Sequence, residues 1–426
     1  MATALAEALG REVDAAARGA IVEALGKVGG AEAERALAGV AGAAAAETKT
    51  AAQLPRARLR AARQAARAET STIDVTRPLG DTAHVLGGGV RVWLDCRRGL
   101  APVLLEEAAA FSPTLEHRAD GTSVVAVKHT GPLAALFAAR TWATLAFPGA
   151  TVKVPRGGDR VAAAAHALAG GSARAAAASL TTGPLRYRIA WAGGGKRRAE
   201  VYRIAEAAAV LEPSLVNDPT DAPWEVVLRE GATSVAAEWV PSLEDPRFAY
   251  RQDDVPAASH PTIAAALAFL AGAVPGDVVW DPFVGSGLEL CERALRGPYE
   301  RLVGTDLEAA AVDAARANLK ACGAQRYDVR FHDVEQGAPA GLKPTLVITN
   351  PPMGRRVHRR ADLRELLAGA VRTAARVLVP GGRFVWVSPF PAELRTVATS
   401  AGLVFTRGHQ VDLGGFDAEI QVFRKA

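Results

Sequence analysis

The sequence has little of several features that mark other classes of protein. Its 426 residues include only three cysteines, Cys96, Cys291 and Cys322. They have neither the spacing of a metal site nor the even number of a disulfide framework, which predicts a reducing compartment. No uncharged apolar run reaches the roughly 18 residues of a membrane helix. Acids within the first dozen residues, with no apolar stretch, argue against a signal peptide. We therefore expect a cytoplasmic protein.

Lysine and methionine are also scarce, whereas alanine and arginine are abundant, which is typical of a high-GC genome. Hydrophobic residues make up 49% and charged residues 22% of the chain, enough for a packed core. The length predicts two to four domains. The net charge of +5 is compatible with an acidic partner such as nucleic acid, without requiring one.

Residues 1–70 are rich in helix-forming residues interrupted by glycines. The stretch from Gly19 to Ala38 resembles a HEAT-type pair of amphipathic helices, although one or two such units rarely stand alone. A basic helical run follows, which indicates either a solvated helix face, the reading we favour, or contact with an RNA backbone. Its arginines are Arg56, Arg58, Arg60, Arg63 and Arg67.

Residues 71–242 show a mixed α+β pattern. The predicted strands cover residues 89–95, 122–129, 185–192, 224–229 and 234–239. The predicted helices begin near Arg98 and cover residues 133–145 and 203–211. A flexible basic loop, residues 193–198, interrupts the second half of this region.

The last third of the chain carries the most specific pattern. An apolar strand ends at Asp281 and leads through D-P-F-V-G-S-G into a helix. Gly285 and Gly287 would let the backbone turn tightly and approach a ligand at the helix N-terminus. A second strand ends in Asp306, and an acid about 20 residues beyond such a loop suits a ribose hydroxyl. The loop is neither G-x-G-x-x-G nor a P-loop, so NAD and ATP are less expected.

Strands and helices alternate from there to the C-terminus. After Asp306 the pattern predicts a helix over 309–321, strands over 327–333 and 346–349, a helix over 366–378, and strands over 383–388, 403–411 and 420–424. This alternation predicts a doubly wound, Rossmann-like sheet with an antiparallel edge.

The segment Leu346–Gly354 reads L-V-I-T-N-P-P-M-G, a buried strand that stops at Asn350. The two prolines hold the following chain extended and rigid. In open α/β sheets, ligands bind outside the carboxyl ends of the strands. The amide oxygen of Asn350 and the carbonyl of Pro351 could therefore hold an NH2 group in one orientation. A plain strand-to-loop turn is the alternative.

Taken together, D-P-F-V-G-S-G, Asp306, Asp333 and N-P-P-M-G resemble the class I S-adenosylmethionine-dependent methyltransferases that modify exocyclic amines. With Arg247-F-A-Y-R and Ala258-S-H-P-T, the order is similar to the THUMP-type tRNA guanosine N2-methyltransferases. The middle region is similar to that family in layout, through Arg98-G-L-A-P-V-L-L-E-E and Tyr187-R-I-A-W. The resemblance implies a ferredoxin-like subdomain (71–155), a THUMP-like RNA-binding domain (156–242) and a methyltransferase domain (243–426), which follow the HEAT-like segment (1–70).

The resemblance also implies roles for individual residues. The methionine and sulfonium part of S-adenosylmethionine would lie against Asp281, Phe283, Gly285 and Gly287. Asp306 would bind its ribose, and Asp333 would bind its adenine amine. Pro261 and Thr262 would close the cofactor pocket. The target amine would meet Asn350, Pro351, Pro352 and Met353. The tRNA would contact Arg186, Arg188, Lys196, Arg197 and Arg198, together with Arg355 and Arg356. No metal is expected, because the sulfonium is already activated.

Two points leave alternatives open. Arg355, Arg356, His358, Arg359 and Arg360 would either contact phosphate or form a solvated start to the next helix. Met353 stands where the family has an aromatic ring that stacks on the base, and a thioether packs less rigidly. Phe416 could replace that ring, although a core position is favoured. The rival functions are rRNA guanine-N2 methylation, DNA or RNA adenine-N6 methylation, and RNA binding with weak catalysis.

Overall fold

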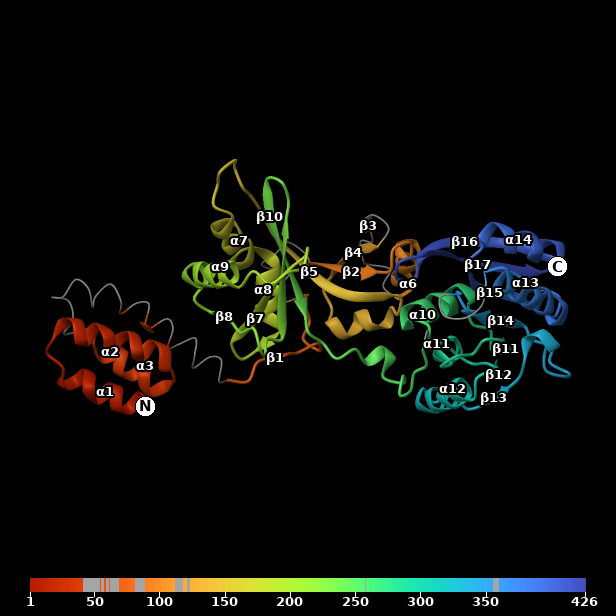
Figure 1. Ribbon diagram of the computed structural model, residues 1–426, viewed down its shortest axis with the longest axis horizontal. Coiled ribbons are helices and arrows are strands. Elements are labelled where there is room, and N and C mark those ends of the chain that lie inside the picture. The colour runs from red at the N-terminus through yellow and green to blue at the C-terminus, as the bar shows by residue number, and fades with distance from the viewer. Residues whose placement is uncertain are drawn as a thin grey trace. The chain divides into compact units, whose positions relative to one another are not determined.

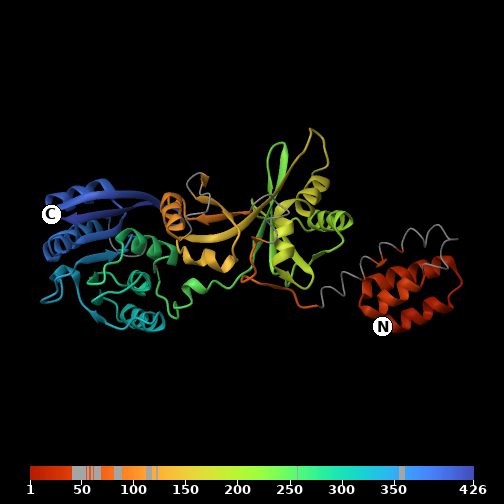
Figure 2. The same ribbon diagram turned by 180° about the vertical axis from the view of Figure 1, so that it is seen from behind.

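The structure is a computed structural model that describes residues 1–40, 54, 57–58, 61, 69–80, 89–111, 118–120, 123–256, 258–354 and 360–426. These residues form two compact units (Figures 1 and 2). Unit 1 contains Met1–Val92, His129–Ala134 and Ala146–Leu243. Unit 2 contains Trp93–Lys128, Ala135–Leu145 and Glu244–Ala426.

Unit 1 begins with three short helices, α1 (Ala2–Arg11), α2 (Ala15–Val28) and α3 (Ala31–Gly39). The side chain of Asp14 caps α2 by accepting a hydrogen bond from the backbone N–H of Ala17 at 2.8 Å. Leucine and valine side chains fill the space between the helices. Arg58, from the predicted basic run, donates to the carbonyl of Leu37 at 2.9 Å and so caps the end of α3. Arg56, Arg60, Arg63 and Arg67 lie outside the described residues.

The rest of unit 1 is a sheet with three helices. Its strands run in the order β5-β10-β9-β7-β8. Strands β9 and β10, both of which the sequence predicted, pair antiparallel. The strands of this sheet are the second half of β5 (Trp142–Lys153), β7 (Leu185–Trp191), β8 (Leu215–Asn217), β9 (Trp224–Glu230) and β10 (Ser234–Pro241). Strands β1 (Thr72–Ile73) and β6 (Thr181–Thr182) pair with each other in a separate two-stranded sheet. The helices are α7 (Arg160–Ala169), α8 (Gly171–Leu180) and α9 (Arg198–Leu211). Trp224, Trp239 and Tyr187 are fully buried in this core.

Unit 2 takes its first elements from the middle of the chain. They are β2 (Val90–Cys96, shared with unit 1), α6 (Ala101–Phe111), β3 (Arg118–Asp120), β4 (Val124–His129), the 3-10 helix η3 (Leu133–Ala138) and the start of β5. The predicted helix over 133–145 is wrong beyond Ala138, because β5 begins at Trp142. The backbone N–H groups of Arg140 and Thr141 donate to the carboxylate of Glu107, both at 2.9 Å, instead of to helical carbonyls. A distant side chain therefore ends this helix.

The rest of unit 2 is a seven-stranded sheet in the order β13-β12-β11-β14-β15-β17-β16. The first five strands are parallel, and β17 and β16 add an antiparallel edge. The strands are β11 (Val278–Asp281), β12 (Arg301–Asp306), β13 (Tyr327–Phe331), β14 (Leu346–Thr349), β15 (Arg383–Ser388), β16 (Leu403–Asp412) and β17 (Asp417–Lys425). The predicted Rossmann-like sheet with an antiparallel edge is confirmed.

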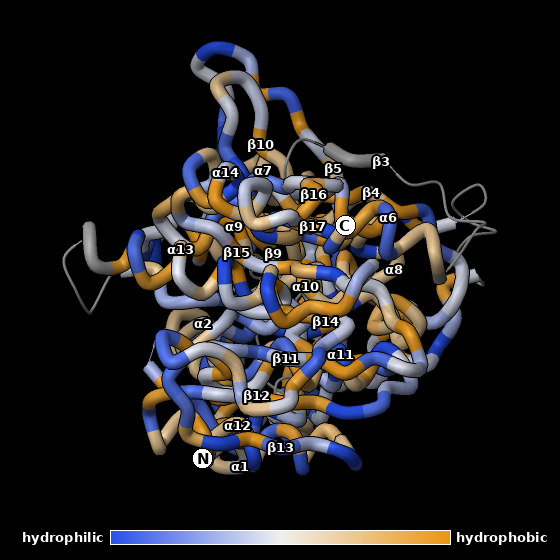
Figure 3. Tube along the Cα trace, turned by 90° about the vertical axis from the view of Figure 1, so that its right-hand side faces the viewer, coloured by the Kyte–Doolittle hydropathy of each residue, from blue (hydrophilic) through white to orange (hydrophobic). Residues whose placement is uncertain are grey.

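Helices cover both faces of this sheet (Figures 1 and 2). Helices α10 (Pro261–Ala271), α11 (Leu288–Leu295) and α12 (Ala309–Ala321) pack on one face. Helices α13 (Arg360–Val377) and α14 (Pro391–Ser400) pack on the other, over Trp280, Val347 and Phe384. The 3-10 helices η4 (Pro246–Phe248) and η5 (Val334–Gln336) complete the unit. All four residues of β14 are buried, which explains its apolar run (Figure 3).

The strand order of the sheet reverses between β11 and β14. From β11 the chain moves outward through β12 to β13, then returns to β14 on the other side of β11. Beyond the carboxyl ends of two strands where the order reverses, the connections diverge and leave room for a ligand. Asp281 ends β11, and Asn350 directly follows β14.

Candidate active site

A hydrogen bond joins the two strand ends at the point of reversal. The hydroxyl of Thr349 donates to Oδ1 of Asp281 at 2.6 Å, and the backbone N–H of Phe283 donates to the same oxygen at 3.0 Å. Oδ2 of Asp281 is buried and has no partner among the described residues. Burial, followed by the negative charge of Glu289, raises the pKa of Asp281 well above its usual value. The charged form of Asp281 thus has no donor or cation at Oδ2 among the described residues, and a bound cation would lower its pKa again.

The glycines of D-P-F-V-G-S-G are required by the backbone. Gly285 has φ +49° and Gly287 has φ +79°, both in the left-handed region. A Cβ at Gly287 would lie 3.0 Å from Cβ of Ala315, so this glycine lets α11 approach α12. A Cβ at Gly285 would meet no atom closer than 4.0 Å, so the loop faces open space there. Gly287 thus serves packing, and Gly285 lies where a ligand could approach.

Two further acids follow the neighbouring strands. Asp306, at the end of β12, accepts hydrogen bonds from the backbone N–H groups of Gly285 at 2.9 Å and Glu308 at 3.1 Å. Asp333, just after β13, accepts from Glu335 at 2.9 Å and caps η5. Beside them lie two apolar side chains, Leu307 and Phe331, which are 51% and 65% exposed. Sequence reasoning did not single them out, although an apolar residue next to an acid at a strand end is a readable signal.

Asn350 is linked to two residues that sequence reasoning also missed. Its amide Nδ2 donates to Oγ of Ser259 at 2.8 Å, and Ser259 in turn donates to Oε1 of Glu289. The amide oxygen of Asn350 is buried without a partner among the described residues. Pro351 is buried, and no described residue donates a hydrogen bond to its carbonyl. Among the described residues, Asn350 and Pro351 therefore have two acceptors without a donor, and their role in holding an amine stays a prediction.

The rest of the N-P-P-M-G turn opens towards solvent. Pro352 is exposed and Met353 is half-buried. Gly354 has φ +77°. Arg355, Arg356, His358 and Arg359 lie outside the described residues, and Arg360 begins α13.

Pro261 and Thr262 form the buried first turn of α10 and follow Ser259 closely. The hydroxyl of Thr262 lies 2.8 Å from Nδ1 of His260, which caps the helix. Burial lowers the pKa of His260 to about 4, with further contributions from Arg97 and Arg251. This imidazole is therefore neutral at physiological pH.

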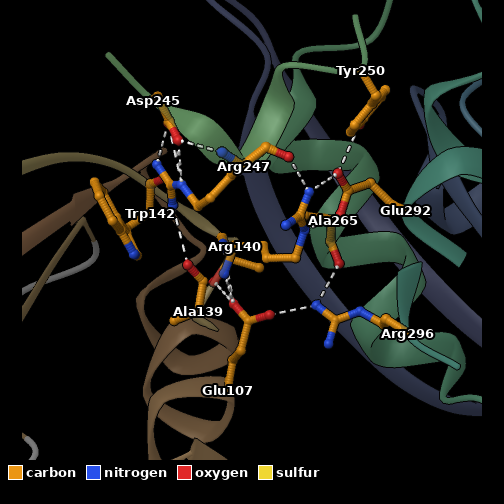
Figure 4. Close-up of polar contacts among 11 residues, drawn as sticks. Glu107, Ala139, Arg140, Trp142, Asp245, Arg247, Tyr250, Ala265, Glu292 and Arg296 are labelled. Carbon is orange, nitrogen blue, oxygen red and sulfur yellow. Dashed lines mark hydrogen bonds and ion pairs between the residues drawn. The ribbon is translucent and has the colours of Figure 1, made fainter. Parts of the chain in front are cut away.

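A buried ionic network lies on the next turn of α11, within unit 2 (Figure 4). Glu292 is fully buried, and its carboxylate accepts hydrogen bonds from Nε of Arg140 at 2.7 Å and from the hydroxyl of Tyr250 at 2.7 Å. Arg140 also donates to the carbonyl of Arg247, and Arg296 pairs with Glu107. Burial raises the pKa of Tyr250 far above its usual value, so its hydroxyl stays a donor. The network ties residues 107–140 to α11.

Five of the basic residues predicted to contact nucleic acid lie in unit 1, namely Arg186, Arg188, Lys196, Arg197 and Arg198. Arg186 is buried and pairs with Asp221 at 3.0 Å and Asp218 at 3.5 Å. Arg188 pairs with Glu225 at 2.7 Å. Arg197 pairs with Glu230 at 2.6 Å and lies over the ring of Trp191, 4.3 Å from its centroid. Lys196 and Arg198 are exposed.

Two classes of site do not occur among the residues that the structure describes. No group of three or more histidine, cysteine, aspartate or glutamate side chains could hold a metal ion there. Within the same residues, no helix has the length and apolar character to cross a membrane.

Comparison with known proteins agrees with this geometry. Residues 249–418 match the RMKL-like methyltransferase domain family (UPF0020). This domain contains Asp281, the glycine loop, Glu289 and Asn350. The matched residues include strands β11 to β16 of the seven-stranded sheet.

Curated relatives are similar to this chain over only part of their own length. The tRNA (guanine(6)-N2)-methyltransferase of Thermus thermophilus is 32% identical over 39% of this chain and 49% of its own. The tRNA (guanine(10)-N2)-dimethyltransferase of Methanothermobacter thermautotrophicus is 28% identical over 33% of this chain and 42% of its own. The U6 snRNA (guanine-N(2))-methyltransferase THUMPD2 of Bos taurus is 30% identical over 39% of this chain and 33% of its own. The chain thus spans about half or less of the length of these curated relatives.

Solved structures share the fold beyond that domain. The crystal structure of TrmN from Thermus thermophilus superposes with a TM-score of 0.64 and 24% identity, over 79% of this chain and all of the other. SMU.472, crystallised with SAH, gives a TM-score of 0.61 and 13% identity over 79% of this chain and 98% of its own. At these levels of identity, both similarities show a shared fold alone.

Proposed function

We propose that the protein is an S-adenosylmethionine-dependent RNA methyltransferase that acts on the N2 amine of a guanine in tRNA. One observation carries the proposal. Two buried oxygens without partners among the described residues, Oδ2 of Asp281 and Oδ1 of Asn350, lie at neighbouring strand ends on the two sides of the strand reversal. A cationic cofactor and an amine substrate would satisfy one oxygen each.

The residues around β11 and β12 fit S-adenosylmethionine. The carboxylate of Asp281 suits its positively charged methionine part, beside Phe283 and the turn through Gly285 and Gly287. Asp306 and Asp333 would accept from the ribose and the adenine amine, and Pro261 and Thr262 would close the pocket. Exposed Leu307 and Phe331 offer apolar surface for the adenine ring. The bound cofactor supplies a methyl group activated on a sulfonium.

The residues after β14 would orient the target amine. An aromatic amine shares its lone pair with its ring and is a weak nucleophile. When Oδ1 of Asn350 and the carbonyl of Pro351 accept its two N–H groups, the lone pair is directed away from both acceptors. The same oxygens stabilise the positive charge that develops on the nitrogen. Rigid positioning by the two prolines supplies the orientation on which most of the rate depends.

The names of the relatives motivate the choice of guanine and of RNA. The Thermus thermophilus and Methanothermobacter thermautotrophicus relatives are named for guanine N2 in tRNA, and the bovine relative for guanine N2 in U6 snRNA. We infer that the ferredoxin-like and THUMP-like regions bind RNA, with exposed Lys196 and Arg198 as the main candidates. Arg188 and Arg197 would contribute only by exchanging their acidic partners for phosphate, and buried Arg186 is better suited to a structural role. Arg355 and Arg356 remain predicted RNA contacts.

The test is a methylation assay with a radiolabelled methyl donor and three substrates: total tRNA, rRNA and DNA. After digestion to nucleosides, we expect the label in N2-methylguanosine from tRNA. Label in N6-methyladenosine, or only in rRNA or DNA, would overturn the assignment.

A variant links the product to the site. Asn350→Ala should lower kcat by about 10²–10³-fold, as for the loss of one transition-state hydrogen bond. Its calorimetric affinity for S-adenosylhomocysteine should stay at the wild-type value, because Asn350 does not hold the cofactor. Loss of both properties together would make Asn350 a structural residue.

A further inference from the structure

A buried carboxylate in the methyltransferase domain has no structural explanation of its own. Glu289 lies in the first turn of α11, between the buried residues Leu288 and Leu290, and is only 3% exposed. No cation pairs with it among the described residues. An acid at a helix N-terminus is stabilised by the helix dipole, yet an apolar side chain would fill this place without the cost of burying a charge.

The carboxylate has one side-chain donor, the hydroxyl of Ser259. A serine hydroxyl has a single hydrogen and two lone pairs. If that hydrogen is given to Glu289, the oxygen of Ser259 can only accept from other groups. It accepts from Nδ2 of Asn350 at 2.8 Å, so Asn350 must turn its NH2 group towards Ser259.

This constraint fixes the direction of the asparagine amide. The oxygen and nitrogen of an asparagine side chain exchange places by a half-turn, with almost no change in shape. In the orientation that Ser259 requires, the oxygen faces away from Ser259 and remains buried without a described partner. In the opposite orientation, an NH2 group would face the N–H groups of the target amine, and two donors would meet.

We propose that Glu289 and Ser259 are positioning residues that hold Asn350 with its amide oxygen towards the substrate amine. The proposal rests on the function proposed above, because it assigns the polarity of the same site. Glu289 acts through Ser259, and Ser259 acts through Asn350. Neither residue needs to touch the substrate.

The relay depends on the charge of Glu289. A protonated carboxyl could donate to Ser259, whose hydrogen would then be free to turn towards Oδ1 of Asn350. Burial raises the pKa of Glu289 to about 7. The hydrogen bond from Ser259 lowers this pKa, and the negative charge of Glu292 raises it further. The other titratable groups around it are Asp281 on β11 and Cys291 on α11, whose pKa values the charge of Glu289 raises. The relay is therefore oriented above about pH 7 and loses its direction below it.

The test compares wild type with Glu289→Gln, Ser259→Ala and the control Glu393→Gln in the RNA methylation assay, as a function of pH. Glu393 is also an acid in the first turn of a helix of this domain, but its side chain is 47% exposed. We expect wild type and Glu393→Gln to lose kcat as the pH falls through about 7. The pH profile of Glu289→Gln should lack this loss of kcat on the acidic side (the acidic limb), because a glutamine side chain does not titrate. Ser259→Ala should lower kcat by about 10–100-fold, as supporting residues commonly do, with unchanged affinity for S-adenosylhomocysteine.

The outcomes separate this proposal from the function on which it rests. If wild type methylates guanine N2, but Ser259→Ala keeps its kcat or the acidic limb persists in Glu289→Gln, the relay is wrong and the proposed function stands. A limb that persists would then point to Asp281. If wild type does not methylate RNA, the proposed function itself fails. Should Ser259→Ala misfold, the pH profile of Glu289→Gln alone decides.

Discussion

Replacing Arg140 with methionine should destabilise unit 2 strongly. The substitution removes the cation that contacts Glu292 at 2.7 Å. Of its donors among the described residues, the fully buried carboxylate then keeps the hydroxyl of Tyr250 alone. Breaking a buried ion pair from one side costs about 3–5 kcal/mol. For a unit of this size, about 2–4 °C of Tm is lost per kcal/mol, so we expect the transition to fall by roughly 6–20 °C. The backbone N–H of Arg140, which donates to Glu107, is retained.

A second substitution and a control test the reason for this loss. Arg140→Met combined with Glu292→Gln removes the unpaired charge but keeps an acceptor for Tyr250, so most of the stability should return. Arg364→Met breaks the exposed pair with Glu393, whose side chains are 41% and 47% exposed. Exposed pairs contribute at most about 1 kcal/mol. Calorimetry of the full chain measures the transition, and hydrogen exchange of Leu288–Leu295 assigns it to α11. If Arg140→Met melts no earlier than Arg364→Met, or the double variant recovers nothing, the charge argument fails.

Three further predictions follow from the glycine loop, Glu289 and the basic loop. Gly287→Ala should destabilise the protein, because its Cβ would lie 3.0 Å from Cβ of Ala315. Gly285→Ala should mainly weaken the binding of S-adenosylhomocysteine, measured by calorimetry. Equal effects of the two substitutions on Tm would contradict this division of roles. The folded-state pKa of Glu289, about 7, is raised above the ordinary 4.5, so the folded protein holds a proton that the unfolded chain releases. Its stability should therefore fall by about 3 kcal/mol as the pH rises from 4.5 to 7, and melting curves of Glu289→Gln should lack this part of the pH dependence. Lys196→Ala with Arg198→Ala should reduce the slope of log affinity for RNA against log salt by about 0.7–0.9 for each lost phosphate contact; an unchanged slope would remove both residues from the RNA interface.

Local sequence patterns were sufficient for the C-terminal sheet. The strands alternate with helices along the chain, and the acids or amides at their ends follow directly, so the places of Asp281, Asp306 and Asn350 relative to the strands could be predicted. Each of these inferences depends on residues within one strand and its following turn. The strand order then brings the ends together by a general rule of open sheets.

Features that depend on distant contacts could not be predicted in this way. The helix expected over 133–145 stops because Glu107, far away in the sequence, takes the N–H groups of Arg140 and Thr141. Ser259, Glu289 and Asn350 come from three different elements, and nothing local marks them as one chain of hydrogen bonds. The only hint was an acid within the apolar stretch Leu288-E-L. Likewise, the acidic partners of Arg186 and Arg188 lie more than 30 residues away in the sequence. The sequence therefore did not show that these two arginines are already paired and not free to bind phosphate.

The helix α11 carries Glu289 and Glu292 one turn apart, and this has a practical consequence for dissecting the protein. The family match begins at residue 249, which suggests that a fragment starting there would be a self-sufficient enzyme. Such a fragment would lose Arg140 and leave the buried carboxylate of Glu292 without its cation, one turn from the residue that orients Asn350. The smallest working fragment should therefore keep residues 93–145 as well. The stable unit in three dimensions therefore includes residues that lie outside the family match.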